Sequence, residues 1–260
     1  MINFFDSNFW ATSNFFSEEE KRISFMKISE ILSNNNISNL IITNKLSLNY
    51  DWDVGNNELL SNKDLIENDK FFLCFVLTPD VHFKYNFDDY ILNAFKHKVR
   101  LFRFFPKSHL FYLNDFYMCK IFKKLSDISF PIMLDFKELD ITGNKYFAIN
   151  DLERLLRKNK KIPLILETTL KQCMFNRFYY PLLEKFENIY LEISGMLLMD
   201  QIENFVLKFG SKRLIFGTNY PSNPLELSIN RMLLSELSEE VKKDISYNNI
   251  YKIIKGIEIE

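Results

Sequence analysis

Eight short apolar segments, rich in β-branched and aromatic residues, alternate with amphipathic helical segments along the whole chain. The apolar segments cover residues 2–5, 40–43, 71–77, 99–105, 131–134, 162–166, 189–193 and 213–216. Each is nearly continuous in its hydrophobicity, which is typical of parallel strands covered on both faces. Eight strands that alternate with helices predict an α/β protein with a closed (β/α)8 TIM barrel.

An open, doubly wound sheet is the alternative architecture for the same alternation of strands and helices. Such a sheet usually carries a glycine-rich turn after its first strand. Here the first strand continues into Asp6-Ser7-Asn8-Phe9-Trp10, and the chain contains no GxGxxG motif. No segment rich in Pro, Gly or Ser divides the chain, so we expect residues 1–260 to form one barrel domain.

The ends of several helices are marked by capping residues. Ser17 and Glu20 form a capping box before an apolar stretch that begins at Phe25. Gly210 follows a helical pattern and predicts its end, and Ser238 predicts the start of the last helix. The segment 50–57 contains turn formers beside aromatic residues, and we expect it to be a loop that forms a rim or lid, or a dimer contact.

Charge and cysteine usage exclude several classes of function. The chain has 33 basic and 34 acidic residues, and this balance argues against a nucleic acid or an anionic membrane as partner. The three cysteines are far apart and form no CxxC pair, so we expect free thiols in a reducing cytoplasm. No apolar stretch is long enough to span a membrane.

Polar side chains follow most of the predicted strands at their carboxyl ends. In a (β/α)8 barrel these positions form the mouth that carries the functional residues. The polar and aromatic residues at these positions are Asp6, Asn8, Trp10, Thr78, Asp80, His82, Arg103, His109, Asp135, Glu167, Thr168, Glu192, Ser194 and Asn219.

The order of several motifs resembles the amidohydrolase-related family, which includes the 2-amino-3-carboxymuconate-semialdehyde decarboxylases. Residues 213–221 are similar to that family's closing pattern Arg-Leu-hydrophobic-Phe-Gly-Ser/Thr-Asp-x-Pro. Residues 188–195 resemble its seventh strand, and residues 249–253 resemble its terminal Asn-x-x-Arg-Leu. Residues 5–10 stand where the family begins with Asp-x-His-x-His. The resemblance implies a hydrolase or a decarboxylase that acts on a small carboxylated compound.

The positions that hold a divalent metal ion in that family carry other residues here. Asn8 and Trp10 replace the first pair of histidines, Asp135 replaces the histidine after strand five, and Glu167 the one after strand six. Asn219 stands in place of the aspartate after strand eight. Amide oxygens bind zinc weakly, and an indole does not bind it at all. The chain has only three histidines, and none is at these positions, so we expect no histidine-bound zinc.

Three hypotheses describe the predicted mouth. In the first, Asp135 and Glu167 are a catalytic carboxylate pair, one ionised and one protonated. Arg103 then binds a substrate carboxylate, and His109 carries a second proton. The alternative role of Asp135 and Glu167 is structural: they form salt bridges to Arg103 or Arg177, or they cap the following loops.

The second hypothesis is a hard-cation site. Asp135 and Glu167, with the amide oxygens of Asn8 and Asn219, form an oxygen-only set that favours Mg²⁺, Mn²⁺ or Ca²⁺ over Zn²⁺.

The third hypothesis is a catalytically degenerate barrel that binds a small molecule or a protein partner. Trp10, Phe136 and Tyr220 then supply aromatic surface in the mouth. The resemblance also suggests a homodimer.

Overall fold

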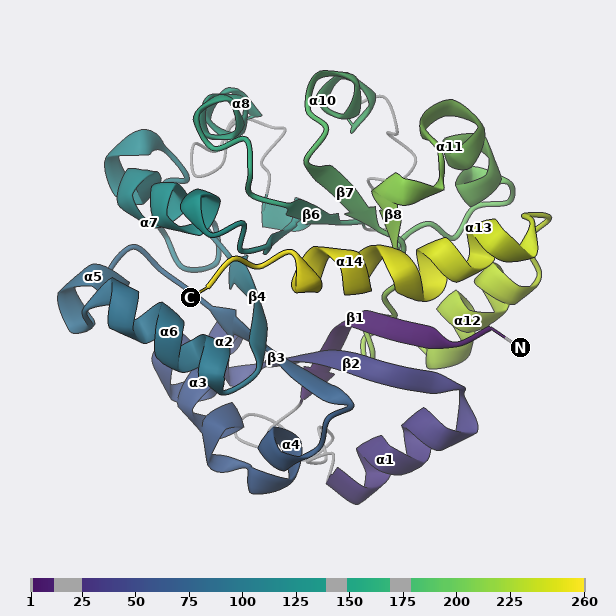
Figure 1. The fold of residues 1–260 in the computed structure, drawn as a ribbon, viewed down its shortest axis with the longest axis horizontal. Helices are drawn as coiled ribbons and strands as arrows, with labels where there is room; N and C mark the ends of the chain where they lie inside the picture. The colour runs from purple at the N-terminus through teal and green to yellow at the C-terminus, as the bar shows by residue number, and fades with distance from the viewer. Residues whose placement is uncertain (1, 12–24, 139–148, 169–178, 260) are drawn as a thin grey trace.

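Eight parallel strands are arranged around a central axis, with helices outside them, in a computed structural model that describes residues 2–11, 25–138, 149–168 and 179–259 (Figure 1). The strands are β1 (Phe4–Ala11), β2 (Ile37–Asn44), β3 (Phe71–Val76), β4 (Val99–Phe104), β5 (Ile132–Asp135), β6 (Leu164–Glu167), β7 (Ile189–Glu192) and β8 (Leu214–Ile215). They pair in sequence order, each parallel to the next. All eight predicted strands are therefore present.

Backbone hydrogen bonds between the first strand and the segment after β8 close the barrel. Ser7 N donates to Phe216 O over 3.1 Å, Asn219 N donates to Asn8 O over 2.8 Å, and Trp10 N donates to Tyr220 O over 2.9 Å. The fold is the predicted (β/α)8 barrel.

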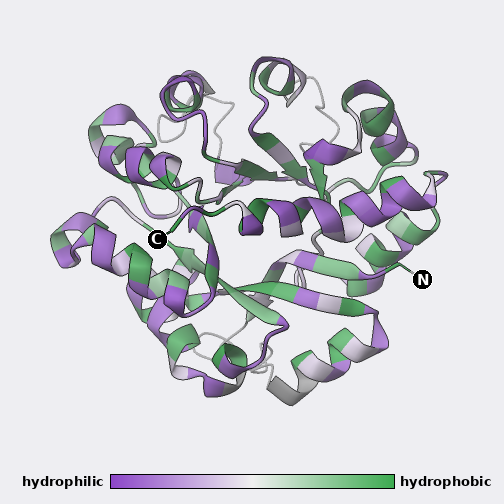
Figure 2. Ribbon diagram, viewed as in Figure 1, coloured by the Kyte–Doolittle hydropathy of each residue, from purple (hydrophilic) through white to green (hydrophobic). Residues whose placement is uncertain are grey.

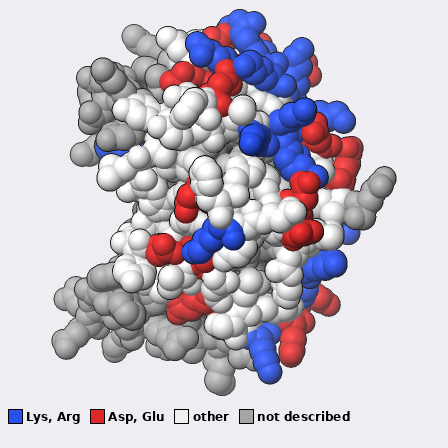
Figure 3. All heavy atoms as spheres, turned by 90° about the vertical axis from the view of Figure 1, so that its left-hand side faces the viewer, with Lys and Arg blue, Asp and Glu red and all other residues white. Residues whose placement is uncertain are grey.

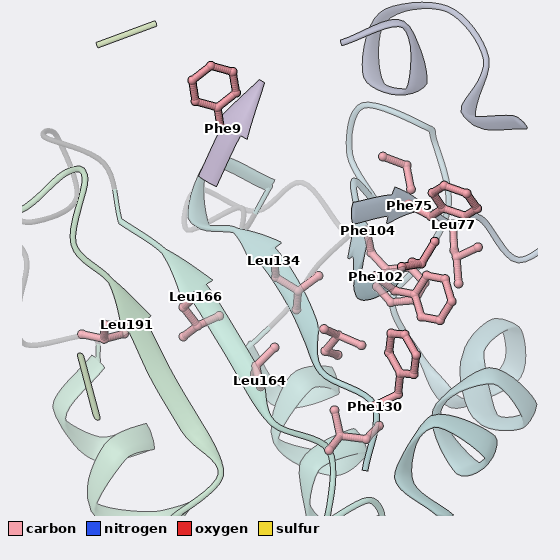
Figure 4. Packing of buried hydrophobic residues seen from close by; sticks show 14 of the residues in the cluster. Phe9, Phe75, Leu77, Phe102, Phe104, Phe130, Leu134, Leu164, Leu166 and Leu191 are labelled. Carbon is pink, nitrogen blue, oxygen red and sulfur yellow. The ribbon is translucent and has the colours of Figure 1, made fainter. Parts of the chain in front are cut away.

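Helices surround the barrel, most of them on its outer face (Figure 1). They are α1 (Phe25–Asn34), α2 (Leu46–Asn49), α3 (Trp52–Ser61), α4 (Lys63–Glu67), α5 (Val81–Lys84), α6 (Phe87–Lys96), α7 (Asp115–Asp127), α8 (Ile149–Lys158), α10 (Tyr179–Lys185), α11 (Gln201–Phe209), α12 (Leu225–Leu233), α13 (Glu239–Lys243) and α14 (Asn249–Lys255). Figure 2 shows hydrophobic strands at the centre and alternating hydropathy along the helices. The main core lies between strands and helices, where Phe102, Phe130, Leu134 and Leu164 pack closely (Figure 4).

The predicted helix boundaries agree with the structure where it describes them. Gly210 ends α11 with a φ of 78°, a backbone conformation that glycine adopts without strain. Ser238 accepts a hydrogen bond from Val241 N at the start of α13. The predicted capping box of Ser17 and Glu20 lies outside the described residues.

The prediction of a loop over residues 50–57 is wrong, because α3 begins at Trp52. Asp51 caps this helix by accepting hydrogen bonds from Asp53 N and Val54 N. Trp52 and Leu59 are buried on the inner face of the helix, so tertiary packing overrides the turn-forming composition.

A small apolar cluster fills the interior of the barrel. Seven strands each contribute one residue to it: Phe5, Ile41, Cys74, Leu101, Met133, Ile165 and Ile215. Ile250, Ile253 and Ile254 of α14 join the same cluster, and Figure 1 shows α14 lying across one end of the barrel. The amino-terminal end of the barrel is therefore closed by α14, and the interior remains polar only towards the opposite end.

Candidate active site

A layer of charged side chains lies directly beyond the apolar interior layer, towards the carboxyl ends of the strands. Side chains two residues apart on a strand point to the same face. Arg103 follows Leu101 by two positions, Asp135 follows Met133, and Glu167 follows Ile165. Glu192 stands level with Glu167, which in turn stands level with Asp135, in the register of the neighbouring strands.

Arg103 is the centre of this layer, and its side chain is fully buried. Its Nη2 forms an ion pair with Glu167 Oε2, and its Nη1 donates to Asn8 Oδ1 over 3.0 Å. The guanidinium carbon lies 4.5 Å from the ring centroid of Trp10 and 5.2 Å from that of Phe105. Ion pair, hydrogen bond and cation–π contacts together compensate for removing this charge from water.

Two influences act on the pKa of Arg103. Burial lowers it, because a charged group is less stable away from water. The acidic groups Asp135 and Glu192 act in the opposite direction and favour the charged guanidinium.

A hydrogen-bonded chain continues from Arg103 to the opposite side of the barrel. Asn8 accepts from Arg103 and donates through Nδ2 to Glu192 Oε2 over 3.1 Å. Glu192 also accepts from Ser194 N over 2.7 Å and from Ser194 Oγ over 2.8 Å. Burial raises the pKa of Glu192 to about 7, although these hydrogen bonds act to lower it. Four strands, β6, β4, β1 and β7, thus contribute to one continuous network.

Gly217 allows this network to approach the segment after β8. A Cβ atom at this position would collide with the carboxyl group of Glu192 and with Asn8 Cβ. Only glycine therefore fits between the strand end and the network.

A second buried carboxyl, Asp6, joins the start and the end of the chain. Its Oδ1 accepts from Asn8 N and from Thr218 N, each over 3.0 Å, and its Oδ2 accepts from Thr218 Oγ1 over 2.6 Å. Burial raises the pKa of Asp6 to about 6, against the lowering effect of these hydrogen bonds.

Sequence reasoning placed Asp6 and Glu192 among the strand-end residues but gave neither of them a role in the site. Their interactions could not be inferred from residue type, because Glu192 contacts Asn8 and Asp6 contacts Thr218 where β1 meets the segment after β8 and closes the barrel.

The two predicted catalytic carboxylates lie on neighbouring strands, with Asp135 in register with Glu167. Glu167 forms the salt bridge to Arg103 that the sequence left open as its alternative role. Asp135 Oδ1 accepts a hydrogen bond from Lys137 N over 2.8 Å. This bond caps the following loop, which is the alternative role that the sequence suggested for Asp135. Asp135 is 8% exposed and Glu167 1%, so Asp135 is the more accessible of the two.

The other predicted site residues divide into two groups. Asn8 and Trp10 contact Arg103, and Asn219 is joined to Asn8 through its backbone. His109 instead bonds through Nε2 to Leu48 O over 3.0 Å and lines a separate aromatic groove beyond Phe105. Of the aromatic set, Trp10 contacts Arg103, Tyr220 packs on Phe9 with ring centroids 5.2 Å apart, and the Phe136 side chain lies outside the described residues.

Fold and site together define a (β/α)8 barrel whose carboxyl end carries a buried arginine–carboxylate network. No family model matches the sequence, and no curated protein matches it by sequence. Solved structures do match in fold, over almost the whole chain.

One similar structure is a dihydroxybenzoic acid decarboxylase from a Polaromonas species, with bound manganese and the inhibitor 2-nitroresorcinol. It has 12% sequence identity and a TM-score of 0.73, and the match covers 98% of this chain and 97% of that one. A 5-carboxyvanillate decarboxylase from Novosphingobium aromaticivorans, complexed with manganese, gives 12% identity, a TM-score of 0.71 and coverage of 98% and 96%. A TIM-barrel protein from Bordetella bronchiseptica has 13% sequence identity and a TM-score of 0.71, and the match covers 98% of this chain and 99% of that one. The predicted TIM-barrel fold is thereby confirmed, and decarboxylases of carboxylated aromatic compounds share it.

The polar layer does not fit the manganese ion that two of these structures contain. Among the described residues, no group of three or more His, Cys, Asp and Glu side chains is arranged to hold a metal ion. The oxygens that a cation would need accept hydrogen bonds from protein donors, as at Glu192 and Asp6, or pair with Arg103, as at Glu167.

Proposed function

We propose that this chain is a decarboxylase-like enzyme that acts on a small carboxylated compound without a histidine-bound zinc ion. Support comes from the fold shared with decarboxylases of carboxylated aromatic compounds and from the buried cation at the carboxyl ends of the strands. A hydrolase remains the other activity that the sequence resemblance implies.

The observation that carries the proposal is the unused hydrogen-bonding capacity of Arg103. Its guanidinium has five N–H donors, and Nε, though buried, has no hydrogen-bond partner within the described part of the chain. A planar guanidinium recognises a carboxylate through two parallel hydrogen bonds. Trp10, which lies over the guanidinium, offers an apolar surface for the rest of a small, flat substrate.

The mouth residues divide the chemistry between binding and proton transfer. Arg103 orients the substrate carboxylate, and the ion pair with Glu167 fixes the guanidinium in place. As the bond between the carboxylate and its carbon breaks, carbon dioxide leaves and the electron pair remains on that carbon. Asp135, the more exposed carboxyl, donates the proton that this carbon takes up and recovers one from water.

Carbon dioxide release from a panel of small aromatic carboxylic acids tests the proposal. Asp135→Asn is expected to lower kcat about 10²- to 10⁴-fold, the usual contribution of a positioned proton donor. Asp69→Asn is the control, because the Asp69 side chain is 99% exposed and pairs only with Lys98 among the described residues. Unchanged turnover in both Asp135→Asn and Glu167→Gln would sink the carboxylate mechanism.

A binding function without catalysis is the second candidate, and the ion pair between Glu167 and Arg103 favours it, because it engages one of the two carboxyl groups that the catalytic hypothesis needs. A thermal-shift screen with the same acids separates the two, because a ligand that binds the folded state raises the melting temperature. Stabilisation by an acid that is never turned over supports the binding function.

We also propose a second copy of this chain as partner. Six exposed side chains, mostly aromatic, lie together near α5 and α7. Four of them line one groove, namely Tyr50, Phe83, Leu110 and Tyr117, and the rings of Tyr112 and Phe116 contact Tyr117. Phe83 is 93% exposed and Phe116 86%. A whole aromatic side chain has an area of about 150–250 Å². Multiplied by the exposed fractions of the six residues, this gives an exposed area of roughly 800 Å². A standard interface buries about 800 Å² on each partner.

The molecular mass in solution tests this partner. The chain has a mass of 31.2 kDa, and sedimentation equilibrium should give twice that value. Phe83→Ser combined with Phe116→Ser should give the monomer, whereas Met199→Ser combined with Leu207→Ser should not, although these side chains are 88% and 86% exposed. A monomeric wild-type protein would contradict the proposal.

The charge distribution is consistent with partners other than nucleic acid. Figure 3, which views the face carrying α5 and α7, shows a broad uncharged area, with Lys and Arg gathered along one edge and interspersed with Asp and Glu. Among the described residues, no helix has the length and hydrophobicity that crossing a membrane requires. A cytoplasmic location remains part of the proposal, supported by the scattered cysteines.

A further inference from the structure

We propose that the guanidinium of Arg103 is the resident cation of this barrel and takes the role that a bound divalent ion fills in manganese-containing barrels of the same fold. The inference concerns the cation alone and does not depend on which reaction the chain performs.

The carboxyl end of the barrel carries several buried acidic groups, three of them level with one another on neighbouring strands. Glu167, Glu192, Asp6 and Asp135 are all buried there, and they come from different strands. Several carboxyl groups in a buried site repel one another unless a cation neutralises them or protons remain on them. Such a site needs a positive charge in order to fold with its carboxylates ionised.

Arg103 supplies this charge from within the chain. It is ion-paired with Glu167, and Asp135, Glu192 and Glu138 all favour its charged form. Lys242, the other buried cation among the described residues, donates to Leu233 O away from this layer. Arg103 is therefore the buried positive charge that faces these carboxylates.

The amide of Asn8 shows how the site is adapted to an arginine. Its oxygen accepts from Arg103 and its nitrogen donates to Glu192. A metal ion would also bind the amide oxygen, but the guanidinium already uses it. One amide thus links the cation to a second carboxylate without an added ion.

Removing the guanidinium should leave Glu167 as an unpaired buried carboxylate that a small added cation can neutralise. Without Arg103, Glu167 and the oxygen of Asn8 lose their partner and remain next to Asp135 and Glu192. Oxygen donors of this kind suit a hard divalent cation such as Mn²⁺. The inference therefore predicts a gain of manganese binding in a variant that lacks the guanidinium.

Thermal unfolding with and without Mn²⁺ tests the inference on the whole protein, with no need for a substrate. Millimolar Mn²⁺ should leave the melting temperature of the wild type unchanged and should raise that of Arg103→Met, because a ligand of the folded state stabilises it. Arg103→Lys, which keeps the charge, should respond like the wild type.

Arg213→Met is the matched control. Arg213 is also partly buried, but it donates to the backbone carbonyls of Ile189, Leu183 and Phe186. Its loss exposes no carboxylate, so this variant should gain no response to Mn²⁺.

Two results overturn the inference. One is a wild-type protein that Mn²⁺ stabilises as much as it stabilises Arg103→Met. The other is a folded Arg103→Met that shows no response to Mn²⁺. If Arg103→Met does not fold in buffer, the wild-type protein is titrated with Mn²⁺ in a calorimeter. Stoichiometric binding of manganese overturns the inference, and absence of binding supports it.

Discussion

Arg103 and Glu167 form an ion pair across the interior of the barrel, and neither side chain reaches solvent. Arg103 comes from β4 and Glu167 from β6, so the pair connects strands that are not neighbours in the sheet. Asn8 extends the connection to Glu192 on β7. The carboxyl end of the barrel is thus held together by a single ionic network.

Breaking the ion pair from one side should strongly destabilise the protein. Arg103→Met leaves the Glu167 carboxylate buried without its partner, which typically costs about 3–5 kcal/mol. The double variant Arg103→Met with Glu167→Gln should recover part of this loss, because the uncompensated charge is then absent. Urea denaturation of the wild type, Arg103→Met and the double variant measures both effects. If Arg103→Met lowered the free energy of unfolding by less than about 1 kcal/mol, the ion pair would behave like a solvent-exposed pair. That result would contradict the burial of Arg103 and Glu167.

Stability should fall as the pH rises through neutrality, and Glu192 should account for much of the change. Burial raises the pKa of Glu192 from 4.5 to about 7, so folding favours the protonated form. The stabilisation is complete below pH 4.5 and is lost as the pH rises through 7.

Glu192→Gln, which is neutral at every pH, isolates this contribution. From pH 5 to pH 8 the free energy of unfolding of the wild type should fall relative to this variant by about 2–3 kcal/mol. Asp6 acts in the same direction at lower pH, since burial raises its pKa from 3.8 to about 6, and it is retained in both proteins. Parallel pH profiles of the two proteins would show that Glu192 does not titrate in this range.

Gly217 should be intolerant of any side chain. Gly217→Ala places a Cβ atom against the carboxyl group of Glu192, and such overpacking typically costs about 1–3 kcal/mol. Gly256→Ala is the control, because its Cβ atom would meet only backbone oxygens at 3.4 and 3.5 Å. Thermal unfolding should show a lower melting temperature for Gly217→Ala alone. Equal changes in melting temperature for Gly217→Ala and Gly256→Ala would mean that the network around Glu192 accommodates the added Cβ atom without loss of stability.

The strands were predictable because their signal is local. Each apolar run reflects burial on both faces, and every one of the eight became a strand. The placement of Arg103 beyond Leu101, and of Glu167 beyond Ile165, follows from the two-residue periodicity of a strand. Residue type and position were therefore enough to bring Asp135, Glu167, Arg103 and Asn8 to the same end of the barrel.

The interactions within the site were not predictable in the same way. Glu167 pairs with Arg103 across the barrel interior. The sequence offered this salt bridge only as one of the possible roles of Glu167, because sequence distance does not report the contact. The burial that raises the pKa of Glu192 results from the closure of β1 against the segment after β8. His109 was expected in the mouth, but Nε2 bonds to Leu48 O, which belongs to α2. Segment 50–57 was misjudged because the burial of Trp52 outweighs local turn preferences.

Metal analysis of the purified wild-type protein tests the central claim most directly, namely that the cation of this site is Arg103. Mass spectrometry for manganese, magnesium and zinc, after dialysis without chelator, should find each metal well below one equivalent per chain. One tightly bound equivalent of any of these metals, lost in Glu167→Gln, would place the metal in the barrel mouth and contradict the account.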